Sequence, residues 1–109
     1  MRSLALACLC AAGPAAADAP GVSLTYVCDG GAVVSATYGK QDGTDSVVLT
    51  RDGETFTLLA ELSGSGVRYG WPSDGSHNVW WTKGNTATLY WRDGAAGTET
   101  PVLENCRAD

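Results

Sequence analysis

The sequence predicts an all-β fold, a small eight-stranded antiparallel β-barrel stapled by one disulfide. No segment repeats its apolar residues at helical spacing over the length of a helix, whereas short β-branched and aromatic runs recur along the chain. Asp-Gly and Gly-Asn pairs separate several of these runs, and such pairs tolerate the positive φ of two-residue hairpin turns. In a chain of 109 residues, this rhythm is typical of one antiparallel meander that closes into a barrel or folds as a sandwich.

The first 19 residues are predicted to be a secretory signal peptide, outside the folded domain. A short basic start precedes an apolar run over residues 4–12, which is too short to span a membrane. Small residues then offer cleavage sites near Ala17 or Ala19. We therefore expect an exported, periplasmic protein with one β-barrel domain over residues 20–109.

Two cysteines in the apolar run bear on lipid attachment. Cys8 follows a small residue but comes too early, with most of the apolar run's usual length missing before it, and Cys10 follows the bulky Leu9. Both are interpreted as ordinary members of the apolar run. We therefore expect no stable membrane anchor.

The remaining cysteines, Cys28 and Cys106, form an isolated pair in a chain that is expected to be exported, so they should form a disulfide. The bridge would close nearly the whole domain, and the chain-entropy model assigns such a loop about 4 kcal/mol of stabilisation. A metal site is a poor alternative, because two cysteines and His77 do not complete a tetrahedral set at a recognisable spacing. We expect neither a metal nor a cofactor.

The chain is acidic, with a formal net charge of −5 at pH 7. No basic stripe offsets this charge, so the composition argues against nucleic acid as a partner. An acidic body instead attracts cationic partners over long range.

The strands are expected one after another along the domain. They cover residues 22–28, 32–38, 45–50, 54–62, 66–70, 78–83, 86–92 and 101–105. Alternation is clearest in the fourth run, where Phe56, Leu58 and Ala60 share one face and threonines occupy the other. A closed barrel also removes the exposed edges that an open sheet of these strands would present.

The tryptophans are expected to play two different roles. Trp80, Trp81 and Trp91 should fill and seal the barrel, because alternation turns at least one of the adjacent pair inward. Trp91 shares its predicted face with Leu89. Trp71 lies in a loop and is expected to be the most exposed aromatic residue, where it could anchor an interface or cover the open end of the barrel.

Two segments could carry function if their strands pair. Ser65 and Arg68 lie in a glycine-rich segment over residues 62–69, and Lys83 follows a pair of tryptophans in residues 80–84. Pairing would bring a hydroxyl, a guanidinium and an ammonium to one surface with no acid between them. Nothing nearby could act as a base, and His77 is expected in a loop, so we expect a binding surface and not an enzyme.

Four segments in this order resemble the MliC/PliC family of bacterial periplasmic or membrane-bound inhibitors of c-type lysozyme. They are YVCDGG at residues 26–31, SGSGVRY at 63–69, WWTKGNTATL at 80–89, and the lone Cys106 near the end. The resemblance covers essentially the whole domain and implies an eight-stranded barrel with a disulfide. It also implies that c-type lysozyme is the partner.

The resemblance further implies which residues enter the lysozyme cleft. The serine and the lysine that would contact the two catalytic carboxylates correspond to Ser65 and Lys83. The remaining expected contact residues in the inserted loop are Gly64, Gly66, Arg68 and Tyr69. An ammonium between two carboxylates would lower the pKa of the general acid, and flanking glycines would let the backbone enter a narrow cleft.

Each of these residues also has a simpler interpretation. Gly64 and Gly66 could form an ordinary hairpin turn, Lys83 could be a solvated turn lysine, Ser65 a turn serine, Arg68 a surface charge, and Tyr69 either core or rim. Two other functions stay open, a glycan-binding barrel that stacks tryptophans on sugar rings and an envelope protein with no discrete ligand.

The chain departs from the family pattern in three ways. The stretch over residues 70–79 is longer than usual, which could shift Lys83 relative to Ser65. Asn85 occupies a place where an acidic residue is common. The lipid-attachment cysteine of the membrane-bound branch is missing, which points to the periplasmic branch.

Overall fold

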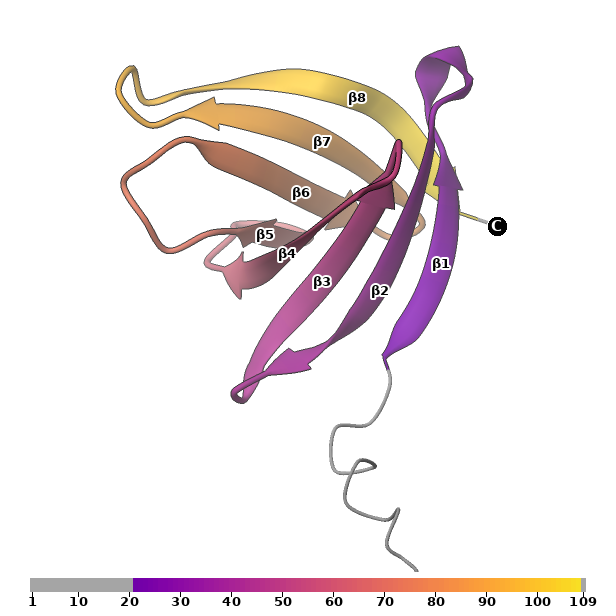
Figure 1. Ribbon diagram of the computed structural model, residues 1–109, viewed down its shortest axis with the longest axis horizontal. Helices are drawn as coiled ribbons and strands as arrows, with labels where there is room; N and C mark the ends of the chain where they lie inside the picture. The colour runs from indigo at the N-terminus through magenta and orange to yellow at the C-terminus, as the bar shows by residue number, and fades with distance from the viewer. Residues whose placement is uncertain (1–20, 109) are drawn as a thin grey trace, which may run out of the picture.

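In the computed structural model, which describes residues 21–108, eight antiparallel strands follow one another around a closed barrel (Figure 1). The strands are β1 (Val22–Val27), β2 (Val33–Gln41), β3 (Thr44–Arg51), β4 (Glu54–Glu61), β5 (Val67–Gly70), β6 (His77–Lys83), β7 (Thr86–Asp93) and β8 (Thr98–Ala108). This confirms the predicted eight-stranded barrel. The predicted signal peptide lies outside the described residues.

The Asp-Gly turns form where the sequence predicts them. Asp42 and Gly43 have φ values of 51° and 81°, and Asp52 and Gly53 have values of 50° and 79°. Two consecutive residues with positive φ are characteristic of the type I′ turn, whose twist matches that of the flanking strands. These turns set the register of the β2–β3 and β3–β4 hairpins.

The barrel interior is packed around Trp80, which is fully buried. Its indole N–H donates a hydrogen bond of 2.9 Å to the Tyr38 hydroxyl, which lies 2.6 Å from the Tyr26 hydroxyl. Burial raises the pKa of Tyr38 above its ordinary value. Leu49 and Leu89 are among the fully buried residues around this group. The buried polar tips are thus satisfied inside the barrel.

The disulfide crosslinks the seam where the barrel closes. Among residues 21–108, β1 and β8 share two paired positions, Tyr26 with Ala108 and Val27 with Arg107. The Cys28–Cys106 bond follows directly, and both cysteines are buried. The predicted pairing is confirmed, and it lies where the strand ladder is shortest.

Some predicted boundaries are wrong. β8 begins at Thr98 and runs to Ala108, well beyond the predicted 101–105. His77 is the first residue of β6 and does not lie in a loop.

The exposure of the tryptophans also differs from the prediction. Trp91 is 45% exposed, slightly more than Trp71 at 41%, although Leu89 on the same strand is buried. Trp91 pairs with the polar residues Asn78 and Thr100, so the buried core that includes Leu89 does not extend to Trp91.

Candidate functional site

The candidate site lies where β5 begins and β6 ends. β5 pairs with β6 through Val67 with Thr82, Arg68 with Trp81, and Tyr69 with Trp80. The Ser65–Gly66 segment therefore reaches the barrel rim beside Lys83, as the sequence predicts. The long connection over residues 71–76 joins the opposite ends of the same two strands (Figure 1). The length of this connection therefore does not set how the Ser65–Gly66 segment and Lys83 lie relative to each other.

Gly66 forms the closest contact between the two segments. Its φ is 63°, and a Cβ atom there would clash with the Thr82 carbonyl oxygen and lie 2.8 Å from Lys83 Cγ. Only glycine allows this approach. Gly64, in contrast, has open space around it among the described residues, so packing does not constrain that side of the loop.

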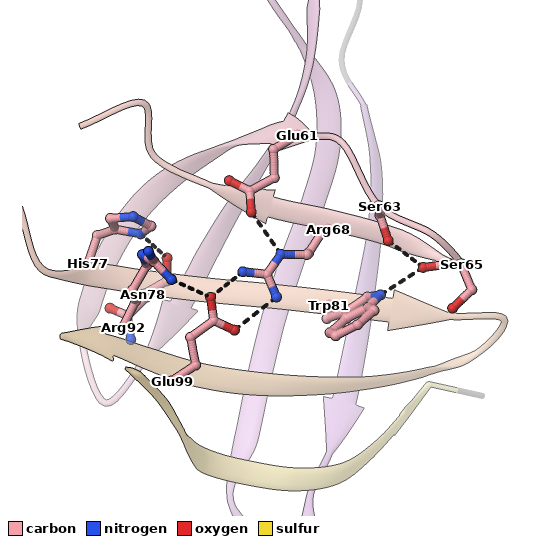
Figure 2. A network of polar contacts seen from close by, with 9 residues as sticks. All are labelled: Glu61, Ser63, Ser65, Arg68, His77, Asn78, Trp81, Arg92 and Glu99. Carbon is pink, nitrogen blue, oxygen red and sulfur yellow. Dashed lines mark hydrogen bonds and ion pairs between the residues drawn. The ribbon is translucent and has the colours of Figure 1, made fainter. Parts of the chain in front are cut away.

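Ser65 is fixed through its backbone. Its carbonyl oxygen accepts hydrogen bonds from the Ser63 hydroxyl at 2.5 Å and from the Trp81 indole N–H at 2.8 Å (Figure 2). Within residues 21–108 the Ser65 hydroxyl itself has no hydrogen-bond partner. The main chain is therefore held while the hydroxyl stays available.

Lys83 projects from the end of β6 just before the β6–β7 turn. Its Nζ lies 4.7 Å from the centroid of the Trp81 ring, a cation–π distance. In the described part of the chain, no carboxylate lies within ion-pair distance of this ammonium. The Thr86 hydroxyl donates to the Lys83 carbonyl at 2.8 Å and closes the turn.

Asn85, at a position where the family resemblance led us to expect an acid, anchors the same turn. Its side-chain amide donates to the Ala108 carbonyl at 3.2 Å, and the Ala108 N–H donates back to the Asn85 carbonyl at 2.9 Å. The turn that carries Lys83 is thus tied to the end of β8.

Arg68 does not lie on an acid-free surface, contrary to the sequence prediction. Its guanidinium donates to both carboxylate oxygens of Glu99 and, at 2.8 Å, to Glu61 (Figure 2). The Glu99 hydrogen bonds raise the pKa of Arg68, and the guanidinium in turn lowers the pKa of Glu99. Arg92 adds a contact to Glu99 at 3.2 Å. The charge of Arg68 is therefore matched within the chain.

Tyr69 belongs to the core and not to the rim. It is 7% exposed, and its ring lies 5.7 Å from that of Tyr38. Burial raises its pKa. As an expected partner contact it is a poor candidate, because almost none of its side chain reaches the surface.

The positions of two residues at the site, Leu62 and Trp81, differ from those predicted from the sequence. Leu62 is 99% exposed, although alternation from Ala60 places it inward in the predicted strand. β4 ends one residue earlier, at Glu61, so that alternation no longer applies. Trp81, predicted to help fill the barrel, instead contacts Ser65 and Lys83 on the outside. The Ser63-Gly64 pair that follows Leu62 is the sequence signal that could have indicated the earlier end of β4.

A polar hollow of about 620 Å³ lies near the far ends of β5 and β6. Trp71, Asp74, His77 and Arg92 are among the residues that line it. Within residues 21–108, no group of three or more His, Cys, Asp or Glu side chains is arranged to hold a metal ion.

The fold is a small barrel with one disulfide, and the site is a rim of that barrel where the Lys83 ammonium lies beside the Ser65–Gly66 segment. A family model described as membrane-bound lysozyme inhibitor of c-type lysozyme matches residues 26–97. Two curated relatives carry this name. The one from Cupriavidus necator is 36% identical over 103 residues, which cover 85% of this chain and 78% of the relative. The one from Pseudomonas aeruginosa is 35% identical over 75 residues, which cover 66% of this chain and 56% of the relative.

The chain belongs to this family, as its sequence motifs predict. The names of the two relatives describe them as membrane-bound. Across residues 21–108 of this chain, we find no helix with the length and apolar character needed to cross a membrane.

Proposed function

We propose that this chain is an exported inhibitor of c-type lysozyme that acts by binding alone. The observation that carries the proposal is the juxtaposition of Ser65 and Lys83 on one rim of the barrel. Neither the hydroxyl nor the ammonium is engaged by a carboxylate of residues 21–108. Both relatives are named as inhibitors of this enzyme, which supports the same partner here.

The chemistry of the target explains why these two groups would inhibit it. A glycosidase of this kind needs one protonated and one ionised carboxyl group on either side of the scissile bond. An ammonium between them favours the ionised form of both and lowers the pKa of the general acid. The hydroxyl of Ser65 can donate to either carboxylate. The inserted rim would also exclude the sugar substrate.

The shape of the rim suits insertion into a cleft. Gly64 has no side chain, and no other described residue comes within 4 Å of the place where a Cβ would lie, so the loop is narrow at this point. Leu62 adds a fully exposed apolar side chain nearby in the same loop. We propose Leu62, Ser65 and Lys83 as the main contacts, with Gly64 and Gly66 shaping the loop.

Arg68 and Tyr69 take supporting roles in this proposal. Arg68 is held by Glu61 and Glu99, and Tyr69 packs inside the barrel. The net charge of −5 would attract a cationic enzyme over long range, while Lys83 supplies the local positive charge for the carboxylates.

An inhibition assay on bacterial cells tests the proposal. The protein purified from the periplasm should protect the cells from lysis by c-type lysozyme. The chain has two lysines, so Lys40→Ala is a matched control for Lys83→Ala. We expect Lys83→Ala to weaken inhibition by about 2 kcal/mol or more, roughly 30-fold, the range of an interface hot spot. Lys40→Ala should inhibit like the wild type.

The outcomes separate function from mechanism. Absence of inhibition by the wild type would refute the proposed function. Full inhibition by Lys83→Ala would refute the role of the ammonium while leaving the family and fold intact.

The proposed location is the periplasm, with the signal peptide cleaved and no lipid anchor. Mass spectrometry of the protein purified from the periplasm should give an unmodified chain that begins close to residue 18 or residue 20. A lipid on Cys8 or Cys10 would show instead that the chain is anchored in the membrane.

A further inference from the structure

We infer that Trp81 is a positioning residue that holds Ser65 and Lys83 in one arrangement for the partner. The inference rests on the proposed function and assigns a role to a side chain that need not contact the partner itself. Trp80 belongs to the barrel core and Trp81 does not. The Trp81 indole instead contacts Ser65 and Lys83 at the site.

One indole contacts both functional segments at the same time. Its N–H, in the plane of the ring, donates to the Ser65 carbonyl at 2.8 Å. The Lys83 ammonium lies over the ring at 4.7 Å from the centroid. A hydrogen bond in the ring plane and a cation over the face use different parts of the indole, so neither contact excludes the other.

The indole is itself held in place. The Arg68 guanidinium also lies over it, with Cζ 5.2 Å from the ring centroid. Figure 2 shows this guanidinium between Glu61 and Glu99, with the Trp81 indole turned toward Ser65. The ion pairs that neutralise Arg68 therefore keep one neighbour of Trp81 fixed. Tyr90, at 6.4 Å between ring centroids, adds a second neighbour.

Both segments need such support. Ser65 lies between two glycines, which have the widest backbone freedom, and Lys83 carries a long side chain with several rotatable bonds. Groups that are ordered before binding lose less entropy when the complex forms. An indole that orders both groups would strengthen inhibition without adding a contact to the partner.

Two substitutions separate the functions of the indole. Trp81→Phe keeps a ring under Lys83 but removes the N–H that Ser65 uses, and Trp81→Leu removes both contacts. We expect inhibition to weaken roughly threefold in Trp81→Phe and tenfold or more in Trp81→Leu, with the melting temperature measured for each. Trp91→Leu, a change of another exposed tryptophan, should leave inhibition unchanged.

A double-mutant cycle and a spectroscopic measurement test positioning directly. Lys83→Ala should cost less in the Trp81→Leu background than in the wild type, because the ammonium is no longer held there. In the free wild-type protein, the Lys83 side-chain methylene protons should show an upfield ring-current shift in the NMR spectrum, which Trp81→Leu removes. If Trp81→Leu does not fold, the ring-current shift of the Lys83 methylene protons in the wild-type protein is sufficient to test the inference.

Three results would overturn the inference. They are full inhibition by a folded Trp81→Leu protein, independent costs in the double-mutant cycle, and random-coil shifts for the Lys83 methylenes in the wild type. If Lys83→Ala is impaired while Trp81→Leu inhibits normally, only the positioning role fails. If Lys83→Ala inhibits normally, the proposed mechanism fails first.

Discussion

Two connections flank the short strand β5, and they have similar compositions but different surroundings. The connection before β5 contains Ser63-Gly64-Ser65-Gly66, and the connection after it contains Ser73-Asp74-Gly75-Ser76. From composition alone either could be an ordinary surface turn. The first lies against Trp81 and Lys83, whereas the second lines the polar hollow beside Trp71.

The serine hydroxyls show the difference most clearly. In the connection after β5, Ser73 Oγ accepts from the Gly75 N–H at 3.1 Å and Ser76 Oγ accepts from the Gly94 N–H at 2.9 Å. Both hydroxyls therefore stabilise the loop itself. In the connection before β5, the Ser63 hydroxyl and the Trp81 indole both hold the Ser65 carbonyl, whereas the Ser65 hydroxyl stays free within the described residues. A loop fixed by its backbone can offer its side chains to a partner.

The glycines should give the largest difference between the two connections. Gly66→Ala forces a Cβ onto the Thr82 carbonyl at a positive φ, so we expect a loss of about 1–3 kcal/mol in the free energy of unfolding. Inhibition should fall as well, because the loop moves away from Lys83. Gly75→Ala meets only Ser73 Oγ, at 3.5 Å, and should change stability by less than about 0.5 kcal/mol. Chemical denaturation measures the free energy of unfolding of both variants. Equal losses in Gly66→Ala and Gly75→Ala would show that the two connections do not differ in how tightly they are packed.

The exposed apolar residues offer a second contrast. Leu62→Ser should weaken inhibition by about 1–2 kcal/mol, because a leucine side chain gains this order of free energy when a partner covers it. The free energy of unfolding of the Leu62→Ser protein should equal that of the wild type, since Leu62 is 99% exposed in the free protein. Trp71→Ala, at the other connection, should leave inhibition intact. Lost inhibition in Trp71→Ala would extend the contact surface to both ends of β5.

The serines should give a smaller effect. Ser65→Ala should weaken inhibition by about 1 kcal/mol, roughly fivefold, because one hydrogen bond is lost. Stability should be unchanged, since the hydroxyl has no partner within residues 21–108. Ser73→Ala should show the reverse, a small loss of stability and normal inhibition. A stability loss in Ser65→Ala would mean that its hydroxyl supports the fold.

The ion pairs around Arg68 predict the smallest effect, and it depends on pH. Hydrogen bonds from Arg68 lower the pKa of Glu99, so its contribution to stability is complete above the pKa of an unfolded glutamate. That contribution is lost as the pH falls through the lower pKa of the folded state. Glu99→Gln should therefore lose less stability than the wild type during acidification.

Melting temperatures at a series of pH values below neutrality test this expectation. Glu54→Gln is the matched control, because Glu54 has no hydrogen bond or ion pair from its side chain within the described residues. Parallel curves for wild type and Glu99→Gln would show that this pair does not contribute to the acid response.

The fold was largely predictable from local patterns. Asp-Gly at residues 42–43 and 52–53 specifies hairpin turns, because these residues accept positive φ. Alternation places at least one of the adjacent tryptophans inside, which is Trp80 in the structure, and the isolated pair Cys28 and Cys106 predicts the crosslink. Each of these signals depends on residues close in sequence or on simple counting.

The surroundings of the site residues depended on contacts between distant segments. Glu99 reaches Arg68 across 31 positions of the sequence, and no local pattern indicates that pairing. Leu62 is exposed because β4 ends at Glu61, one residue before the predicted boundary, and Tyr69 is buried because its strand turns it toward Tyr38.

The sequence by itself determined the antiparallel strands, the turns, the crosslink and, through its motifs, the family and the barrel that the family implies, because these signals lie in short segments or in simple residue counts. Only the tertiary structure decided which of the two cations, Arg68 or Lys83, is left without a carboxylate among the described residues. Strand pairing brings Arg68 to its carboxylates, while Lys83 meets the face of Trp81. Charge matching depends on distances of a few ångströms between separate strands, and those distances arise only when the barrel closes.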